Sequence, residues 1–252
     1  MKLKDKVYII TGATSGMGKA QALLFAKEGA KLVLSGRDLD KGAEVLSSLQ
    51  KMSATALFIP GNVGDADHNH ELVDTALSAF GQLNGLITNA GELGLGEITT
   101  LTAESWNKTF SVNVDSVFYL LKAALPHISR NPGNSILINA SIAAFKSFPN
   151  HPAYCASKAA AVALAKQAAL DYAPIRINCI CPGPVDTPLI HASAVAFPDP
   201  AQAVAAAEQA TLLKRLGLPE DVAELAVFLM ADTSSWITGS VFTIDGGILA
   251  SR

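Results

Sequence analysis

The sequence has 252 residues, of which 50% are apolar, and a formal net charge of −3. This length is sufficient to bury a sizeable core, and α/β folds of this size commonly form one domain, so we expect a single domain over 1–252. The basic residues are scattered, which excludes the electrostatic footprint of a nucleic-acid-binding protein and favours small, neutral or weakly charged partners.

The N-terminal segment and the cysteines indicate the compartment. The apolar run Val7–Ile10 is too short for the core of a signal peptide or for a membrane span, so we expect a cytoplasmic protein with no membrane contact. Cys155, Cys179 and Cys181 are odd in number and lack metal-type spacing. They predict free thiols in a reducing compartment and no bound metal.

Seven apolar segments rich in β-branched residues alternate with segments of helical periodicity. The expected strands are 6–11, 30–36, 54–59, 84–90, 134–141, 175–182 and 240–245, and the expected helices are about 17–28, 39–50, 66–80, 103–128, 153–172 and 220–231. Strands that are apolar on both faces and separated by helices predict a doubly wound, Rossmann-type α/β fold, with a seven-stranded parallel sheet and helices on both faces. The segment at about 187–213 has no clear pattern and is a candidate substrate lid.

A glycine-rich turn, "TGATSGMG", directly follows the first expected strand and leads into the first helix. Glycines allow a tight turn and a close approach of pyrophosphate to the backbone, and the helix N-terminus favours the anion. The spacing is GxxxGxG instead of the usual GxGxxG, and a purely structural turn is the alternative. The order of strand, glycines and helix favours a dinucleotide site, whose expected contacts here are Gly12, Thr14, Ser15, Gly16, Met17 and Gly18.

The end of the second strand, "VLSGRD", bears on which nicotinamide cofactor binds. An acidic side chain there would bind the ribose hydroxyls of NAD, whereas a basic one would accept the 2′-phosphate of NADP. Gly36 stands where the acid is expected, and Arg37 carries a guanidinium suited to a phosphate. NADP is therefore favoured, while Asp38, near the offset expected for the acid, keeps NAD open.

A tyrosine and a lysine stand four residues apart in the alanine-rich stretch "HPAYCASKAA". On a helix, Tyr154 and Lys158 project from the same face. We expect the ammonium to lower the pKa of the phenol, so that Tyr154 can donate and accept a proton. Ser141 ends the strand about a dozen residues earlier, at the sheet edge where ligands bind in open α/β folds.

These motifs together resemble the short-chain dehydrogenase/reductase family in its shorter, single-domain form. The resemblance covers nearly the whole chain and is carried, in order, by "TGATSGMG", "TNAG" at 88–91, Asn113 in "FSVNVDSVF", Ser141, "YCASK", "CPGPVDTP" and "ITGSVFTIDGG". It implies a catalytic tetrad in which Tyr154 is the acid/base, Lys158 lowers its pKa and binds the nicotinamide ribose, Ser141 binds the substrate oxygen and Asn113 supports a proton relay.

The resemblance also implies further contacts with the cofactor. They are Asn62, Val63, Asn89, Ala90, Gly91, Pro182, Gly183, Val185 and Thr187, in addition to Tyr154 and Lys158. Asn62 departs from the family, because members often place an aspartate beside the adenine. Thr88 is a milder departure from the usual asparagine.

We expect hydride transfer between NADP(H), or NAD(H), and a neutral, fairly apolar secondary alcohol or ketone. The lid segment has no arginine for an anionic substrate before Arg215, and Phe145, Phe148 and His151 are expected to shape the pocket. A 3-oxoacyl-carrier-protein reductase is an alternative, for which Arg130 and Arg176 are the available basic residues. A non-catalytic nucleotide sensor and an epimerase or dehydratase are others.

Two further expectations concern the surface. The helix at 153–172 is apolar nearly all round, which suits a homo-oligomer, as the tetramers common in the resembling family suggest, or a deep core position. His68 and His70 lie two residues apart at a polar helix start, which predicts solvated side chains instead of a metal site.

Overall fold

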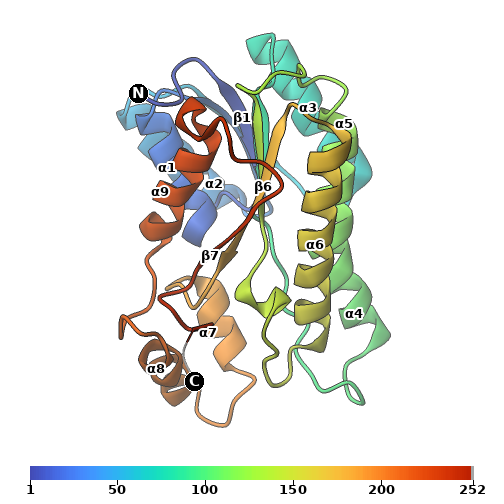
Figure 1. Cartoon of the computed structure of the whole chain (residues 1–252), viewed down its shortest axis with the longest axis vertical. Coiled ribbons are helices and arrows are strands. Elements are labelled where there is room, and N and C mark those ends of the chain that lie inside the picture. The colour runs from blue at the N-terminus through green and yellow to red at the C-terminus, as the bar shows by residue number, and fades with distance from the viewer. Residues whose placement is uncertain (251–252) are drawn as a thin grey trace.

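The computed structural model describes residues 1–250, and its seven parallel strands form one sheet in the order β3-β2-β1-β4-β5-β6-β7. The seven expected strands and the doubly wound arrangement are confirmed (Figure 1). The strands are β1 Val7–Ile10, β2 Lys31–Gly36, β3 Ala56–Pro60, β4 Gly85–Thr88, β5 Ser135–Asn139, β6 Arg176–Pro182 and β7 Val241–Ile244.

Helices cover both faces of the sheet. α1 Gly16–Lys27, α2 Leu39–Lys51 and α9 Pro219–Met230 lie on one face, and α3 Ala66–Phe80, α4 Ala103–Phe110, α5 Ser116–Ala124 and α6 Pro152–Asp171 lie on the other (Figure 1). The helix expected over 103–128 is divided, because a π-helical segment, Ser111–Asp115, separates α4 from α5. Short 3₁₀ turns follow β5 at Ile142–Ala144 and α9 at Asp232–Ser234.

Alternate residues of β1 pack into two hydrophobic cores, one on each face of the sheet. Val7 and Ile9 pack with residues of α3, α5 and α6, whereas Tyr8 and Ile10 pack with residues of α1 and α9. All four side chains are fully buried. Because successive side chains of a strand point to opposite faces, a strand covered on both sides has to be continuously apolar, which is the pattern seen in the sequence.

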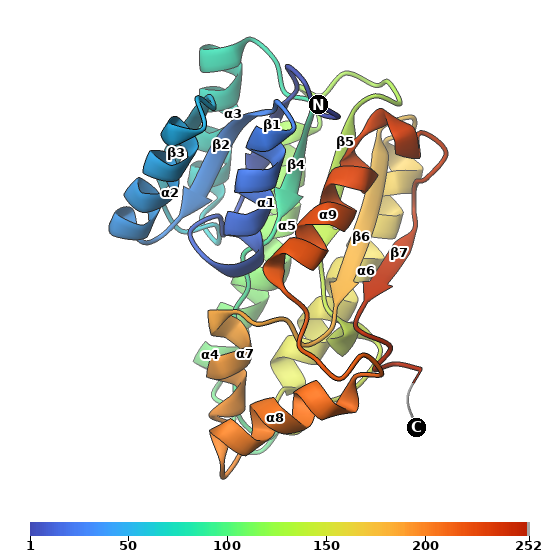
Figure 2. The same ribbon diagram turned by 90° about the vertical axis from the view of Figure 1, so that its left-hand side faces the viewer.

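The strand order places a crevice at the carboxyl end of β1. β1 pairs with β2 on one side and with β4 on the other, so the chain leaves β1 and β4 toward opposite edges of the sheet. Ligands of open α/β sheets bind at such a switch point. The segment expected to be a lid forms two helices, α7 Pro188–Ala194 and α8 Pro200–Ala210, which lie beyond the carboxyl ends of the strands (Figure 2).

Arg176, the first residue of β6, is a buried cation. Its guanidinium donates hydrogen bonds to the carbonyl oxygens of Pro132, Leu229, Ala231 and Ser234. These carbonyls lie in the loop before β5 and at the C-terminal end of α9, where cations are favoured. The expectation that Arg176 could serve a carrier-protein docking patch is wrong, because the side chain is inside the protein.

Arg176→Ala is expected to lower the free energy of unfolding by about 3 kcal/mol, because buried carbonyl groups lose their donors. Urea unfolding followed by circular dichroism measures this. Arg130→Ala is the control, since Arg130 lies over the Tyr172 ring at 5.4 Å and its loss should cost less than about 1 kcal/mol. Equal losses in the two variants would contradict the structural role of Arg176.

Candidate active site

The glycine-rich turn between β1 and α1 packs directly on the segment that follows β4. Gly12 has a φ of +61°, and a Cβ there would lie 2.9 Å from the Cα of Ala90. A Cβ at Gly18 would lie 2.2 Å from the carbonyl oxygen of Gly12. Both positions therefore require glycine, as the sequence predicts for a turn that a dinucleotide approaches closely.

The same turn contacts the start of the lid. A Cβ at Gly16 would lie 2.9 Å from Cγ2 of Thr187, the residue that precedes α7. Ser15, at the N-cap of α1, makes no side-chain hydrogen bond to the helix, so its hydroxyl does not cap the first-turn amides. These amides and the positive end of the helix dipole fit the pyrophosphate of a dinucleotide, and Thr14, Ser15 and Met17 lie in the same turn.

Loops at the carboxyl ends of β2 and β3 lie on the other side of the crevice at the end of β1, where the sequence predicts the adenosine half of a dinucleotide. A Cβ at Gly36 would lie 2.5 Å from Cγ2 of Thr14, so the turn leaves no room for an acid at this position. Arg37 is exposed, and the Asp38 carboxylate caps α2 by accepting a hydrogen bond from Lys41 N at 3.1 Å. The exposed Asn62 follows β3, and its Oδ1 accepts a hydrogen bond from Gly64 N at 3.1 Å. Val63, beside it, is buried.

Asn89 and Asn139, at the ends of β4 and β5, connect the glycine turn to Lys158. Asn89 Nδ2 donates to the carbonyl oxygen of Gly12 at 3.3 Å, and Asn139 Nδ2 donates to Asn89 Oδ1 at 2.5 Å. The backbone carbonyl of Asn139 accepts a hydrogen bond from Lys158 Nζ at 3.0 Å. Sequence reasoning missed Asn139, for which the available signal was its place two residues before Ser141 at a strand end.

Tyr154 and Lys158 lie on the same side of α6, which begins at Pro152. Lys158 Nζ is 5.7 Å from the centre of the Tyr154 ring, and the lysine side chain is buried. Burial lowers the pKa of Lys158 to about 8, so the amine is still mainly protonated at neutral pH.

Tyr154 is half-buried, with its ring facing a cavity. Loss of contact with water raises the pKa of Tyr154 to about 12, and a hydrogen bond with the Ser141 hydroxyl acts in the opposite direction. The expectation that Tyr154 has a lowered pKa is therefore wrong for the protein alone, because desolvation outweighs the contributions that favour the phenolate. Tyr154 holds its proton firmly and is suited to donate it only to a stronger base.

Asn113 lies in the π-helical segment between α4 and α5, and such segments are frequent at functional sites. Its side-chain amide donates to Glu92 O and Ser157 Oγ and accepts from Glu92 N, each at 2.8 Å. A Cβ at Gly91 would lie 3.8 Å from Asn113 Oδ1 and 3.9 Å from Lys158 Nζ. The Asn113 side chain thus joins the segment after β4 to α6, next to Lys158.

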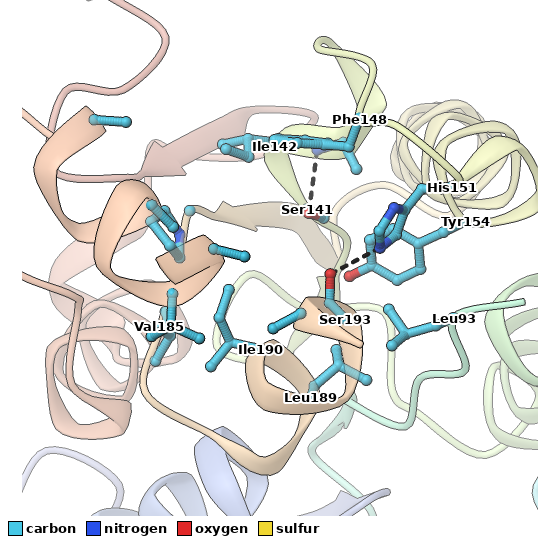
Figure 3. Close-up of a pocket in the computed structure, with 18 of the residues that line it drawn as sticks. Leu93, Ser141, Ile142, Phe148, His151, Tyr154, Val185, Leu189, Ile190 and Ser193 are labelled. Atoms are coloured by element: carbon cyan, nitrogen blue, oxygen red, sulfur yellow. Dashed lines mark hydrogen bonds between the residues drawn. The ribbon is translucent and has the colours of Figure 1, made fainter. Parts of the chain in front are cut away.

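Ser141 and Tyr154 line a cavity of about 650 Å³ at the carboxyl edge of the sheet (Figure 3). Ser141 Oγ accepts a hydrogen bond from Ala143 N at 3.1 Å, which leaves its proton available to a second partner. Most of the other lining residues are apolar. They come from the segment after β4, from the loop before α6, from 182–187 and from α7, α8 and the turn between them, and include Leu93, Ile142, Phe148, Val185, Leu189, Ile190 and Phe197. The charged lining residues are Lys146 and Asp199.

The structure corrects two smaller expectations. Phe145 is exposed and does not line the cavity, whereas Phe148 and His151 do. His68 is buried instead of solvated, because α3 places its ring under Gly61 and its Nε2 lies 2.8 Å from Ser35 Oγ. His70 is exposed, as expected.

Comparison with known proteins gives the same family as the motifs. The family model described as enoyl-(acyl carrier protein) reductase matches residues 12–249. The chain belongs to the short-chain dehydrogenase/reductase family. Cyclohexanol dehydrogenase of Acinetobacter sp. (strain SE19) is 36% identical over 253 residues, which covers 97% of this chain and 95% of that protein.

Two other similar proteins carry the names of different reductases. The 3-oxoacyl-[acyl-carrier-protein] reductase of Thermotoga maritima is 34% identical over 258 residues, 99% of this chain and 100% of that protein. The crystal structure of levodione reductase has a TM-score of 0.94 at 30% identity and covers 99% of this chain and 100% of that chain. This short-chain dehydrogenase/reductase is accordingly an oxidoreductase of a family that generally uses NAD(P)(H).

The geometry described above fits such a cofactor. In this short-chain dehydrogenase/reductase the first-turn amides of α1 are not capped by the Ser15 side chain, which suits a pyrophosphate, and a Cβ at Gly91 would meet no atom closer than 3.8 Å. Among the described residues of 1–250, none of the helices is long and apolar enough to cross a bilayer.

Proposed function

We propose that this chain is an NADP(H)-preferring alcohol dehydrogenase and ketone reductase that acts on neutral, fairly apolar secondary alcohols or ketones. The observation that carries the proposal is the placement of the Ser141 and Tyr154 hydroxyl groups on an apolar cavity, beside the buried amine of Lys158. A ketone in this cavity would be surrounded by apolar side chains and would find its polar partners at one point.

In reduction, each catalytic side chain acts on the substrate oxygen or on its neighbour. Ser141 donates a hydrogen bond to the carbonyl oxygen, which stabilises the negative charge that grows there. Tyr154 then transfers its proton to that oxygen, because an alkoxide is a stronger base than the phenolate. The nicotinamide cofactor supplies the hydride when bound.

Lys158 and Asn113 support this proton transfer. The buried ammonium of Lys158 lies close enough to stabilise the phenolate that remains after Tyr154 has given up its proton. The Asn113 amide fixes Gly91 and Glu92 beside Lys158 and so positions the segment where the nicotinamide ribose would bind. A proton relay through this region would use Lys158, because both donors of the Asn113 amide already have partners.

The preference for NADP is supported by the loop that follows β2. Gly36 has no room for an acidic side chain, and the Asp38 carboxylate is used as a helix cap. Arg37 is exposed beside them, where a guanidinium would pair with a 2′-phosphate. The adenine would lie beside Asn62, with Val63 as a further contact. The cofactor would also contact Asn89, Ala90 and Gly91, and the nicotinamide would lie near Pro182, Gly183, Val185 and Thr187.

A neutral substrate is supported by the lining of the cavity and by the behaviour proposed for 187–213. The charged residues that line the cavity, Lys146 and Asp199, have opposite signs, and the Asp199 side chain caps the N-terminus of α8. We propose that α7 and α8 cover the bound substrate as a lid. The carrier-protein alternative has less support, because Arg176 is buried and Arg130 remains as the basic residue on which it relied.

We also propose a homo-oligomer, a tetramer by analogy with the family. Exposed aromatic and aliphatic side chains support it, because large apolar groups left in water favour association. They include Trp106, which stacks on Phe110 at 4.7 Å, as well as Phe118, Leu170 and Trp236. The three free cysteines suit a reducing compartment, which supports a cytoplasmic location.

Tyr154→Phe is expected to lower kcat/KM for ketone reduction by about a hundredfold or more, because the proton donor is lost while the ring still packs. The assay is NADPH oxidation with a panel of cyclic and linear ketones, for the wild-type protein and the variant. Tyr172→Phe, the same change at the end of α6 and away from the cavity, is the control.

Three results would contradict this assignment. Equal turnover by the wild-type protein and by Tyr154→Phe would remove Tyr154 as the acid. Turnover of 3-oxoacyl groups on a carrier protein without turnover of any free ketone would favour the carrier-protein reductase, and binding of NADPH without any turnover would favour a nucleotide sensor.

Arg37→Ala is expected to raise the KM for NADPH about tenfold through loss of a charge-assisted hydrogen bond, and to leave the KM for NADH nearly unchanged. Initial rates at varied NADPH and NADH measure both constants. A wild-type preference for NADH, or the same increase for both cofactors in Arg37→Ala, would contradict the proposed contact with the 2′-phosphate.

A further inference from the structure

Two polar side chains that the proposed reaction does not use are hydrogen-bonded to each other on the wall of the cavity. His151 precedes α6, and Ser193 lies on α7; both line the cavity that contains Tyr154 (Figure 3). His151 Nε2 is 2.7 Å from Ser193 Oγ, and the histidine is only 3% exposed. This pair is the direct polar contact between the loop before α6 and the lid helix α7.

The proton positions in this pair follow from its neighbours. His151 Nδ1 is 2.5 Å from the carbonyl oxygen of Pro149, which can only accept, so Nδ1 carries a proton. In this tautomer of the imidazole, with the proton on Nδ1, the other nitrogen is an acceptor. Nε2 then has a lone pair, and the Ser193 hydroxyl donates its proton to it.

This assignment makes the Ser193 oxygen an acceptor on the cavity wall. A hydroxyl group has one proton and two lone pairs, and here the proton is directed to His151. Ser193 Oγ can therefore accept a hydrogen bond from a ligand but cannot donate one. A ligand hydroxyl matches this acceptor, whereas a carbonyl or an ether oxygen does not.

The acceptor lies close to the reacting centre. The centre of the His151 ring is 6.3 Å from the centre of the Tyr154 ring, and Ser193 Oγ is hydrogen-bonded to Nε2 of that imidazole. Leu93, Leu189 and Ile190 line the cavity near Ser193 and offer no side-chain hydrogen bond (Figure 3). A hydroxyl group placed against those side chains would lose its contact with water and find no partner, and Ser193 removes this penalty at one position.

We propose that Ser193, oriented by His151, is a specificity-determining residue that accepts a hydrogen bond from a second hydroxyl group of the substrate. The preferred substrates are then diols or hydroxyketones, and simple alcohols and ketones react less well. This inference rests on the proposed function and adds to it the chemical class that the cavity selects.

The test compares cyclohexanol, the isomeric cyclohexanediols and the monomethyl ethers of those diols, oxidised with NADP+. For the wild-type protein, at least one diol isomer is expected to have a kcat/KM about tenfold above that of cyclohexanol. This exceeds the advantage of about twofold that a diol has because either of its hydroxyl groups can be oxidised. Its monomethyl ether should lose this advantage, because an ether oxygen cannot donate to Ser193.

The variants separate recognition from a merely structural role. Ser193→Ala is expected to reduce the ratio of diol to cyclohexanol kcat/KM to that of the ether, and Ser193→Thr, which retains the hydroxyl, should restore the ratio. Ser47→Ala, the same substitution on the exposed face of α2, is the control and should leave the ratio unchanged.

Three results would overturn the inference. A wild-type protein that oxidises cyclohexanol as well as every diol has no second polar contact. A Ser193→Ala variant that loses activity on the diol and on cyclohexanol by the same factor shows that Ser193 only holds α7 in place. Failure of the wild-type protein to oxidise any of these alcohols would refute the proposed function together with the inference, and so is distinguishable from the first two results.

Discussion

The hydrogen bond between the buried amine of Lys158 and the backbone carbonyl of Asn139 is the interaction on which the site depends. An ammonium group removed from water is unfavourable unless a partner compensates for the lost solvation. The carbonyl of Asn139 provides that partner at 3.0 Å, at the end of the central strand β5. The position of the positive charge beside Tyr154 therefore depends on two things. They are the residue at which β5 ends and the packing of α6 against that strand.

The same strand ends connect the two halves of the crevice. The side chain of Asn139 binds Asn89, and Asn89 binds the carbonyl of Gly12 in the glycine turn. A change in the glycine turn, where we propose that the pyrophosphate binds, would thus be transmitted to the backbone that holds Lys158. The wall of the cavity is built differently, mostly from apolar residues, and the hydrogen bond between His151 and Ser193 joins the loop before α6 to α7.

The strands, the helices outside 187–213 and the pairing of Tyr154 with Lys158 were predictable because they depend on local periodicity, whereas α7 and α8 lie in a segment without a clear pattern. A run such as Val7–Ile10 is apolar at every position because both faces of the sheet are covered, and residues four apart on a helix share a face. The π-helical segment around Asn113, the roles of Asn139 and Ser193 and the burial of His68 and Arg176 arise from contacts between distant segments. The raised pKa of Tyr154 has the same origin, since it depends on how completely neighbouring elements exclude water.

The most direct test of the buried charge is an NMR titration of the protein labelled with ¹³C at the lysine Cε atoms. Lys158→Met identifies the resonance, which has to be absent from the spectrum of that variant. The structure predicts one lysine that titrates with a pKa of about 8, separated from the others. A Lys158 resonance that titrates near the ordinary value of 10.5 would show that its amine is in water, and would contradict the site built around Asn139 and Tyr154.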